Sequence, residues 1–100
     1  MDKEGNEISL IDVLGTDIDD IIDQVELKVQ ISKLYEQLEK ILTKREKEIV
    51  LLRYGLTTSG YKTQREIAQK LDISRSYVSR IEKRALKKLR KELKSEKSLI

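Results

Sequence analysis

Cationic and hydroxyl side chains are concentrated between residues 75 and 91 of this hundred-residue chain. The stretch contains eight Lys or Arg residues and one acidic residue, Glu82. Ammonium and guanidinium groups bind phosphate, and a guanidinium can also donate two parallel hydrogen bonds to O6 and N7 of a guanine. These residue types therefore favour recognition of nucleic acid. The structural alternative is a solvated basic face whose charges only complement a helix dipole.

The spacing of these side chains predicts a helix over residues 75–93. At about 100° per residue, apolar and polar positions separate onto opposite sides of that helix. The apolar side consists of Val78, Ile81, Ala85, Leu86, Leu89 and Leu93. The outer stripe consists of Ser76, Arg80, Lys83, Lys87 and Lys91, flanked by Ser79 and Arg84. Arg75 and Tyr77 lie in the first turn, which in a recognition helix faces base edges in the major groove.

A shorter helix is predicted just before it, over residues 63–71. Thr63 and Glu66 form a capping box at its start. The turn at residues 72–74 is sharp, with Asp72 suited to left-handed dihedrals and Ser74 suited to cap the next helix. Two helices that cross steeply over such a turn need a small residue at their closest approach, and Ala68 stands there. The pattern predicts a helix-turn-helix with a shared core of Ile67, Leu71, Ile73, Val78 and Ile81.

Two further helices are predicted over residues 20–42 and 44–54. The first has apolar residues at alternating spacings of four and three, namely Leu27, Ile31, Leu34, Leu38 and Ile41. The second begins at a capping box of Thr43 and Glu46. It ends at Gly55, because Gly readily adopts the left-handed backbone conformation that terminates helices. A polar connection follows at residues 56–62. We therefore expect an all-α fold, a small four-helix domain containing a helix-turn-helix.

Composition excludes several classes of function. The chain has no Cys and no His, so disulfides, thiol nucleophiles and the usual metal ligands and general base are missing. No pair of carboxylates stands out as catalytic. We expect a binding protein rather than an enzyme, with no metal or cofactor. With no apolar run of about eighteen residues and no leader peptide, we expect it to be cytoplasmic and without a membrane partner.

Charge is divided unevenly along the chain. Residues 1–26 contain nine acidic groups and one Lys, a balance of −8, whereas residues 27–100 contain twenty basic and nine acidic groups, a balance of +11. Such a separated excess of cations is typical of a nucleic-acid-binding module.

The acidic residues 1–20 show no sustained helical period, so we expect a flexible linker arm that does not contribute to folding. Residues 8–14 are more apolar than a disordered tail needs. They either bind another molecule or pack on their own domain, and the sequence leaves both open. After Leu93 the period is lost, and we expect residues 94–100 to fray. The predicted organisation is thus an arm at 1–20, a domain at 21–93 and a tail at 94–100.

Two segments also resemble a known family. LTKREKEIVLLRYGL at residues 42–56 and TQREIAQKLDISRSYVSRIEKRALKKLR at residues 63–90 are similar to the two halves of the fourth conserved region of the sigma-70 class of bacterial RNA polymerase initiation factors. The sequences of both segments are most similar to those of sporulation-type sigma factors of spore-forming Gram-positive bacteria. The resemblance implies sequence-specific binding of promoter DNA at the minus-35 element, as the C-terminal domain of a factor that directs polymerase to sporulation genes.

The resemblance also implies roles for particular residues. Residues at positions that the family uses for contacts to bases or the nearby backbone are Arg75, Ser76, Ser79 and Arg80. Contacts to the DNA backbone are expected from Lys62, Arg65, Lys83, Arg84 and Lys87. Lys88 is expected to lie near backbone only. Many family members carry longer polar residues in place of the two Ser, so the DNA sequence that the family prefers cannot be assigned to this chain.

The implied partners are duplex promoter DNA and the RNA polymerase core. The family binds the flap of the polymerase β subunit through an apolar surface of its first two helices, and an anti-sigma protein can use the same surface. The acidic linker of the family threads toward the polymerase active-site channel. Since the region that melts promoter DNA is missing, the chain looks like one domain of a longer factor.

Two other functions are compatible with the sequence. An independent helix-turn-helix regulator that dimerises through the first helix would prefer two-fold-related half-sites one helical turn apart. A basic helical interaction module would instead bind an acidic partner or an anionic membrane, and would be retained on anionic vesicles without affinity for duplex DNA.

Overall fold

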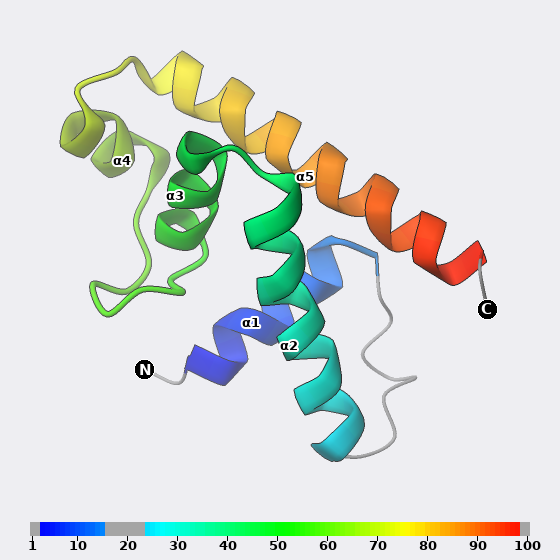
Figure 1. Cartoon of the computed structure of the whole chain (residues 1–100). Coiled ribbons are helices and arrows are strands. Elements are labelled where there is room, and N and C mark those ends of the chain that lie inside the picture. The colour runs from blue at the N-terminus through cyan, green and yellow to red at the C-terminus, as the bar shows by residue number, and fades with distance from the viewer. Residues whose placement is uncertain (1–2, 16–23, 99–100) are drawn as a thin grey trace.

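The computed structural model is all-α and describes residues 3–15 and 24–98. Its helices are α1 Lys3–Val13, α2 Gln24–Ile41, α3 Lys44–Arg53, α4 Gln64–Leu71 and α5 Arg75–Ser98 (Figure 1). The long α5 contacts α2, α3 and α4. Within the described ranges there is no strand, and no helix is long and apolar enough to cross a membrane. The predicted all-α class is confirmed, with five helices among the described residues in place of the four predicted.

The helix boundaries follow from local side-chain hydrogen bonds. In both predicted capping boxes the Thr hydroxyl accepts from a backbone N–H while the Glu carboxylate accepts from the Thr backbone, at Thr43 with Glu46 and at Thr63 with Glu66. Helix α3 is followed by Gly55 at a φ of 68°. Both boxes and the left-handed terminator are confirmed as predicted.

The core consists of two clusters that share α5. One joins the helix-turn-helix to α3 and contains Ile49, Leu52, Ile67, Ala68, Val78 and Ile81. The other lies under the later turns of α5 and contains Leu10, Ile11, Leu14, Leu34, Leu38, Leu42, Val50, Leu56, Ala85, Leu86 and Leu89. The apolar side predicted for residues 75–93 is therefore the side that α5 buries in its own domain.

The helix-turn-helix closes over Ala68, as predicted. This residue is 7% exposed and belongs to the cluster that joins α4 to α5. Its carbonyl accepts from the N–H of Ile73 at 3.0 Å, and Asp72 adopts left-handed dihedrals of φ 56° and ψ 48°. The chain reverses within three residues because one backbone conformation and one small side chain permit it.

One stretch departs from the predictions: residues 3–13 form a helix that packs on the domain. Leu10, Ile11 and Leu14 are all buried in the larger cluster. The expectation of an arm without helical structure is therefore wrong for residues 3–13, and the alternative that residues 8–14 pack on their own domain is the one observed. Residues 16–20 lie outside the described ranges. The sequence does not predict this helix, because its few buried positions stand among residues with weak helix propensity.

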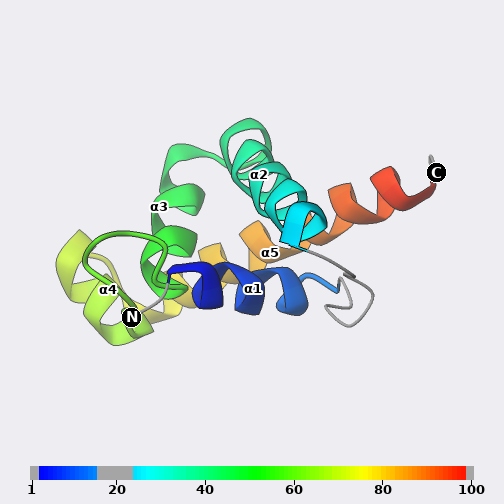
Figure 2. The same cartoon turned by 90° about the horizontal axis from the view of Figure 1, so that it is seen from below.

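Polar contacts also hold α1 against the rest of the chain. Asn6 donates from Nδ2 to the carbonyl oxygen of Gly55 at 3.1 Å, and Arg90 of α5 donates from two nitrogens to the carbonyl of Val13 at 3.3 Å each. Glu7 is buried, and its neighbour is Tyr35 of α2: burial and a hydrogen bond to Glu7 raise the pKa of the Tyr35 hydroxyl. Seen from below, α1 lies over α5 (Figure 2).

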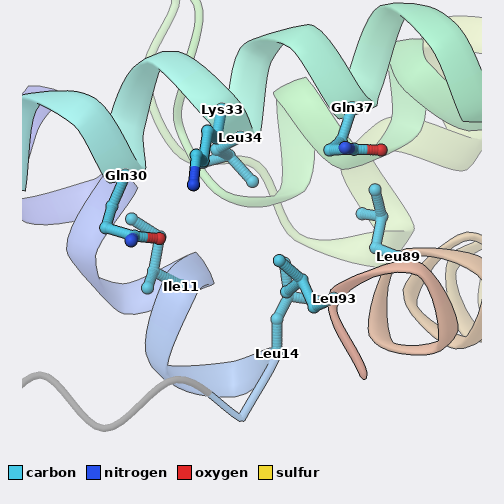
Figure 3. A pocket seen from close by; sticks show the side chains of 8 residues that line it. All are labelled: Ile11, Leu14, Gln30, Lys33, Leu34, Gln37, Leu89 and Leu93. Carbon is cyan, nitrogen blue, oxygen red and sulfur yellow. The ribbon is translucent and has the colours of Figure 1, made fainter. Parts of the chain in front are cut away.

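The packing of α1 against α2 and α5 leaves little empty space. Figure 3 shows Ile11 beside Gln30 of α2 and Leu14 beside Leu93 of α5, with the polar side chains of α2 above the leucines. The cavity between them measures about 20 Å³, which is enough for roughly one water molecule. The N-terminal helix is therefore part of the packed core.

The last helix also runs past its predicted end. Helix α5 continues to Ser98, so the predicted helix end at residue 93 is wrong, and fraying of residues 94–100 stays a prediction. The apolar period does stop near Leu93, but the Lys and Glu residues that follow are good helix formers and can continue a helix beyond its apolar stripe.

We expect Leu10→Ala to lower the free energy of unfolding by about 2–5 kcal/mol, because it leaves a cavity at a fully buried position. Urea unfolding followed by circular dichroism measures this change. Val13→Ala is the matched control on the same helix, where the side chain is 38% exposed, and it should change the free energy by less than about 0.5 kcal/mol. Unchanged stability of the Leu10 variant would mean that α1 lies outside the cooperative fold.

We expect Ala68→Leu to cost about 1–3 kcal/mol, because the larger side chain must force α4 and α5 apart. For a domain of this size, about 1 kcal/mol corresponds to a melting temperature lower by roughly 4–8 °C. Gln69→Leu adds an apolar side chain at the exposed neighbouring position and should melt close to wild type. Melting of the Ala68 variant at the wild-type temperature would contradict the close crossing of the two helices.

Candidate nucleic-acid interface

The first turns of α5 gather all four residues predicted to contact bases. Arg75, Ser76 and Arg80 are exposed and Ser79 is half-buried. Together with Gln64 of α4 they line one surface hollow between the two helices. The structure thus brings together on one open surface the side chains that the sequence assigned to base recognition.

The rotation of α5 about its own axis is set by its buried side. Val78 and Ile81 are 0% and 2% exposed, and they anchor the first turns to α3 and α4. Ser74 caps the helix start as predicted, because its Oγ accepts from the backbone N–H of Tyr77 at 3.1 Å. With the apolar side fixed, the side chain of Arg80 can only project to solvent.

The predicted backbone contacts extend this surface in two directions. Lys83, Arg84 and Lys87 are exposed along α5, and Arg65 is exposed on α4. Lys62 lies in the connection before α4, half-buried, and its backbone N–H donates to the carbonyl of Leu52 at 2.9 Å. Cations beside side chains that contact bases can hold a duplex in register through its phosphates.

A network beneath the surface contains four residues that the sequence patterns did not single out as site residues. Glu82 of α5 has a side chain only 14% exposed, and its Oε1 lies 3.3 Å from Nε of Arg53 and accepts from Nε2 of Gln64 at 3.1 Å. The Arg53 guanidinium also lies over the ring of Tyr61, 5.0 Å from its centroid, and donates to the Tyr61 hydroxyl. Charge patterning could not find Gln64, because it is uncharged. Its position at the start of α4 was the only available signal.

Residues 40–91 match the family model for sigma-70, region 4. That match covers more than half of the chain, including α3, the turn and the first turns of α5 that form the hollow. The chain belongs to the sigma-70 region 4 family.

Relatives of this region 4 domain carry the names of polymerase factors. The chain is 57% identical over 88 residues to the RNA polymerase sigma-28 factor of Bacillus thuringiensis subsp. kurstaki and to the RNA polymerase sigma-K factor of Bacillus subtilis (strain 168). Each alignment covers 88% of the chain, with 37% of the first relative and 30% of the second. It is 50% identical over 93 residues to the RNA polymerase sigma-E factor of Clostridium acetobutylicum, covering 93% of the chain and 39% of that relative. The chain spans less than two fifths of each relative. No solved structure matches it.

Lys88, which the sequence predicts to lie near DNA backbone, forms an ion pair within the domain. Its Nζ lies 2.8 Å from Oε1 of Glu46, whose side chain is only 3% exposed. Burial alone would raise the pKa of the Glu46 carboxyl, but hydrogen bonds from Lys88 and the Thr43 backbone outweigh it and hold the pKa below its ordinary value. Lys88 therefore stabilises the junction of α3 and α5 in this region 4 domain. A helical wheel could not show this, because the partner lies 42 residues away in the chain.

We expect Lys88→Ala to lower the free energy of unfolding at neutral pH by about 1–2 kcal/mol, because it leaves a buried carboxylate without its cation. Lys87→Ala, at the exposed neighbouring position, is the matched control and should change stability by less than about 0.5 kcal/mol.

The effect should depend on pH in a defined direction. Because the Glu46 pKa is depressed in the folded state, the stabilisation is fully present above the ordinary carboxyl pKa and is lost as the pH falls through the depressed value. Denaturant unfolding of both variants between about pH 7 and pH 3 measures this. A difference between them that stays constant over this range would contradict the ion pair.

Proposed function

We propose that this chain binds duplex promoter DNA at the minus-35 element, as the region 4 domain of a sigma factor that directs RNA polymerase to initiate transcription. The observation that carries the proposal is the hollow at the start of α5, where Arg75, Ser76, Ser79 and Arg80 converge on the open side of a helix whose other side is buried. The family membership and the names of the relatives support it. The identity with the sigma-K and sigma-E relatives supports promoters of the sporulation class.

Base recognition would proceed from the exposed start of α5 in the major groove. Nε of Arg80 donates to the carbonyl of Ser76 at 3.5 Å, which orients the guanidinium and leaves its terminal nitrogens available to O6 and N7 of a guanine. Arg75, five residues earlier on the same helix, is the second candidate for such a contact. Ser76 and Ser79 are short and tolerate several bases.

Affinity would come mainly from the cations around this centre. Neutralising a phosphate releases condensed counterions, so each contact contributes a salt-dependent share of binding that does not depend on sequence. The proposed phosphate contacts are Lys62, Arg65, Lys83, Arg84 and Lys87. Binding by this one domain should therefore weaken steeply with salt.

The second proposed partner is the RNA polymerase core, held at the flap of its β subunit through α2 and α3, with an anti-sigma protein as a competitor for the same surface. Two features of these helices support it. Val25 and Val29, one turn apart on α2, are 72% and 46% exposed. On α3, Leu51 and Leu52 line a surface hollow together with Lys47. A factor working on polymerase would act in the cytoplasm.

Of the other functions compatible with the sequence, the membrane-binding module has the least support. It needs an amphipathic helix with a free apolar side. In α5 the apolar residues Val78, Ile81 and Leu89 are 2% exposed or less and belong to the domain core.

Selection from a random duplex library, by the isolated chain and by polymerase core carrying the full-length factor, tests the proposal and supplies the preferred site. On that site we expect Arg80→Ala to cost about 1–3 kcal/mol and to flatten discrimination at one base pair. Lys87→Ala should weaken preferred and scrambled duplexes alike and reduce the slope of log K against log salt by about 1. Binding titrations at several salt concentrations measure both effects.

The same titrations can reject this assignment. If Arg75→Ala and Arg80→Ala each lower affinity uniformly over all single-base substitutions, α5 does not read sequence. A DNA affinity that does not change with salt concentration would contradict the proposed phosphate contacts.

A further inference from the structure

Gln64 occupies a position that the charge pattern did not assign to any role. It is the first residue of α4 and lines the hollow that holds Arg75, Ser76, Ser79 and Arg80. It also lines a neighbouring hollow with Arg53, Tyr61 and Arg65. Its amide is therefore placed among the side chains that the proposed function assigns to base and phosphate contacts.

The orientation of this amide is determined by its partner. Nε2 of Gln64 lies 3.1 Å from Oε1 of Glu82. A carboxylate can only accept hydrogen bonds, so the amide must turn its NH₂ group toward Glu82. The carbonyl oxygen, on the other branch of the amide, is left available to a ligand in the hollow.

Glu82 is itself held in place, so the orientation of the amide is fixed before any ligand arrives. Its carboxylate is mostly buried and lies 3.3 Å from Nε of Arg53, which is packed over the ring of Tyr61. A side chain whose rotamer is already restricted loses less entropy when it binds. Tyr61, Arg53 and Glu82 thus act as positioning residues for Gln64.

We propose that Gln64 is a further specificity-determining residue, whose Oε1 accepts a hydrogen bond from the exocyclic amino group of an adenine or a cytosine in the major groove. The inference rests on the proposed function. In that groove the base donors are N6 of adenine and N4 of cytosine. Arg75 and Arg80 carry only donors, and the hydroxyls of Ser76 and Ser79 are on short side chains. Gln64 supplies the long, oriented acceptor that complements them.

The experiment begins with the preferred duplex selected by the wild-type chain and all of its single-base substitutions. Affinities are measured for wild type, for Gln64→Ala and for Gln64→Met, which keeps the side-chain length without the amide. Gln69→Ala is the matched control, a Gln to Ala change at an exposed position of the same helix. The Gln64 variants should lose discrimination at one base pair, and the control should keep it.

At that base pair the amino group is then removed, by placing purine for adenine or pyrimidin-2-one for cytosine. Wild type should lose about 3- to 10-fold in affinity, the equivalent of one hydrogen bond, whereas both Gln64 variants should lose markedly less. Comparing the two losses cancels any weakening of the base pair itself.

Three results would overturn the inference. If the Gln64 variants weaken binding to all duplexes equally, Gln64 contacts the DNA backbone and not a base. If they discriminate between bases as wild type does, Gln64 has no part in recognition. If they remain as sensitive as wild type to loss of the amino group, another residue accepts its hydrogen bond. In each of these cases the proposed function is still supported if the wild-type preference for one DNA sequence is lost in Arg80→Ala. If wild type shows no sequence preference at all, the proposed function and the role of Gln64 both fail.

Discussion

Burial of one side of α5 is the constraint on which the rest of the structure depends. Val78 and Ile81 join it to the cluster of the helix-turn-helix, and Ala85, Leu86 and Leu89 join it to the larger cluster with α1 and α2. A single helix that serves two cores cannot rotate about its axis without opening both. The direction in which its cations project is therefore set by apolar packing. The exposed charges are not needed to orient the helix and can serve binding.

Much of the fold could be predicted because its signals are local. The capping boxes at Thr43 and Thr63 each involve residues three positions apart, and the reversal at Asp72 needs one left-handed residue. The apolar stripe of α5 repeats at the helical period, so its buried and exposed sides follow from geometry alone. For the same reason the four predicted base contacts lie together, since Arg75, Ser76, Ser79 and Arg80 share one side of the first two turns.

The parts that could not be predicted depend on residues far apart in the chain. Arg90 donates to the carbonyl of Val13, 77 positions away in the chain, and no local pattern in residues 3–13 predicts that contact. Lys88 stands among several equivalent cations, and only the fold reveals that it pairs with Glu46. The role of Gln64 likewise depends on Glu82, 18 positions away. Charge and periodicity show which side of a helix is polar, but not which polar side chain has a partner.

Glu46 links the start of one helix to the docking of another. The same oxygen, Oε1, accepts from the backbone N–H of Thr43 and from the ammonium of Lys88. Fraying the first turn of α3 would therefore weaken the docking of α5, and undocking α5 would weaken the cap of α3. Because the two events are thermodynamically coupled, the amide hydrogens of Thr43 and Glu46, which the capping box holds, should exchange with solvent more slowly than those of an ordinary helix end.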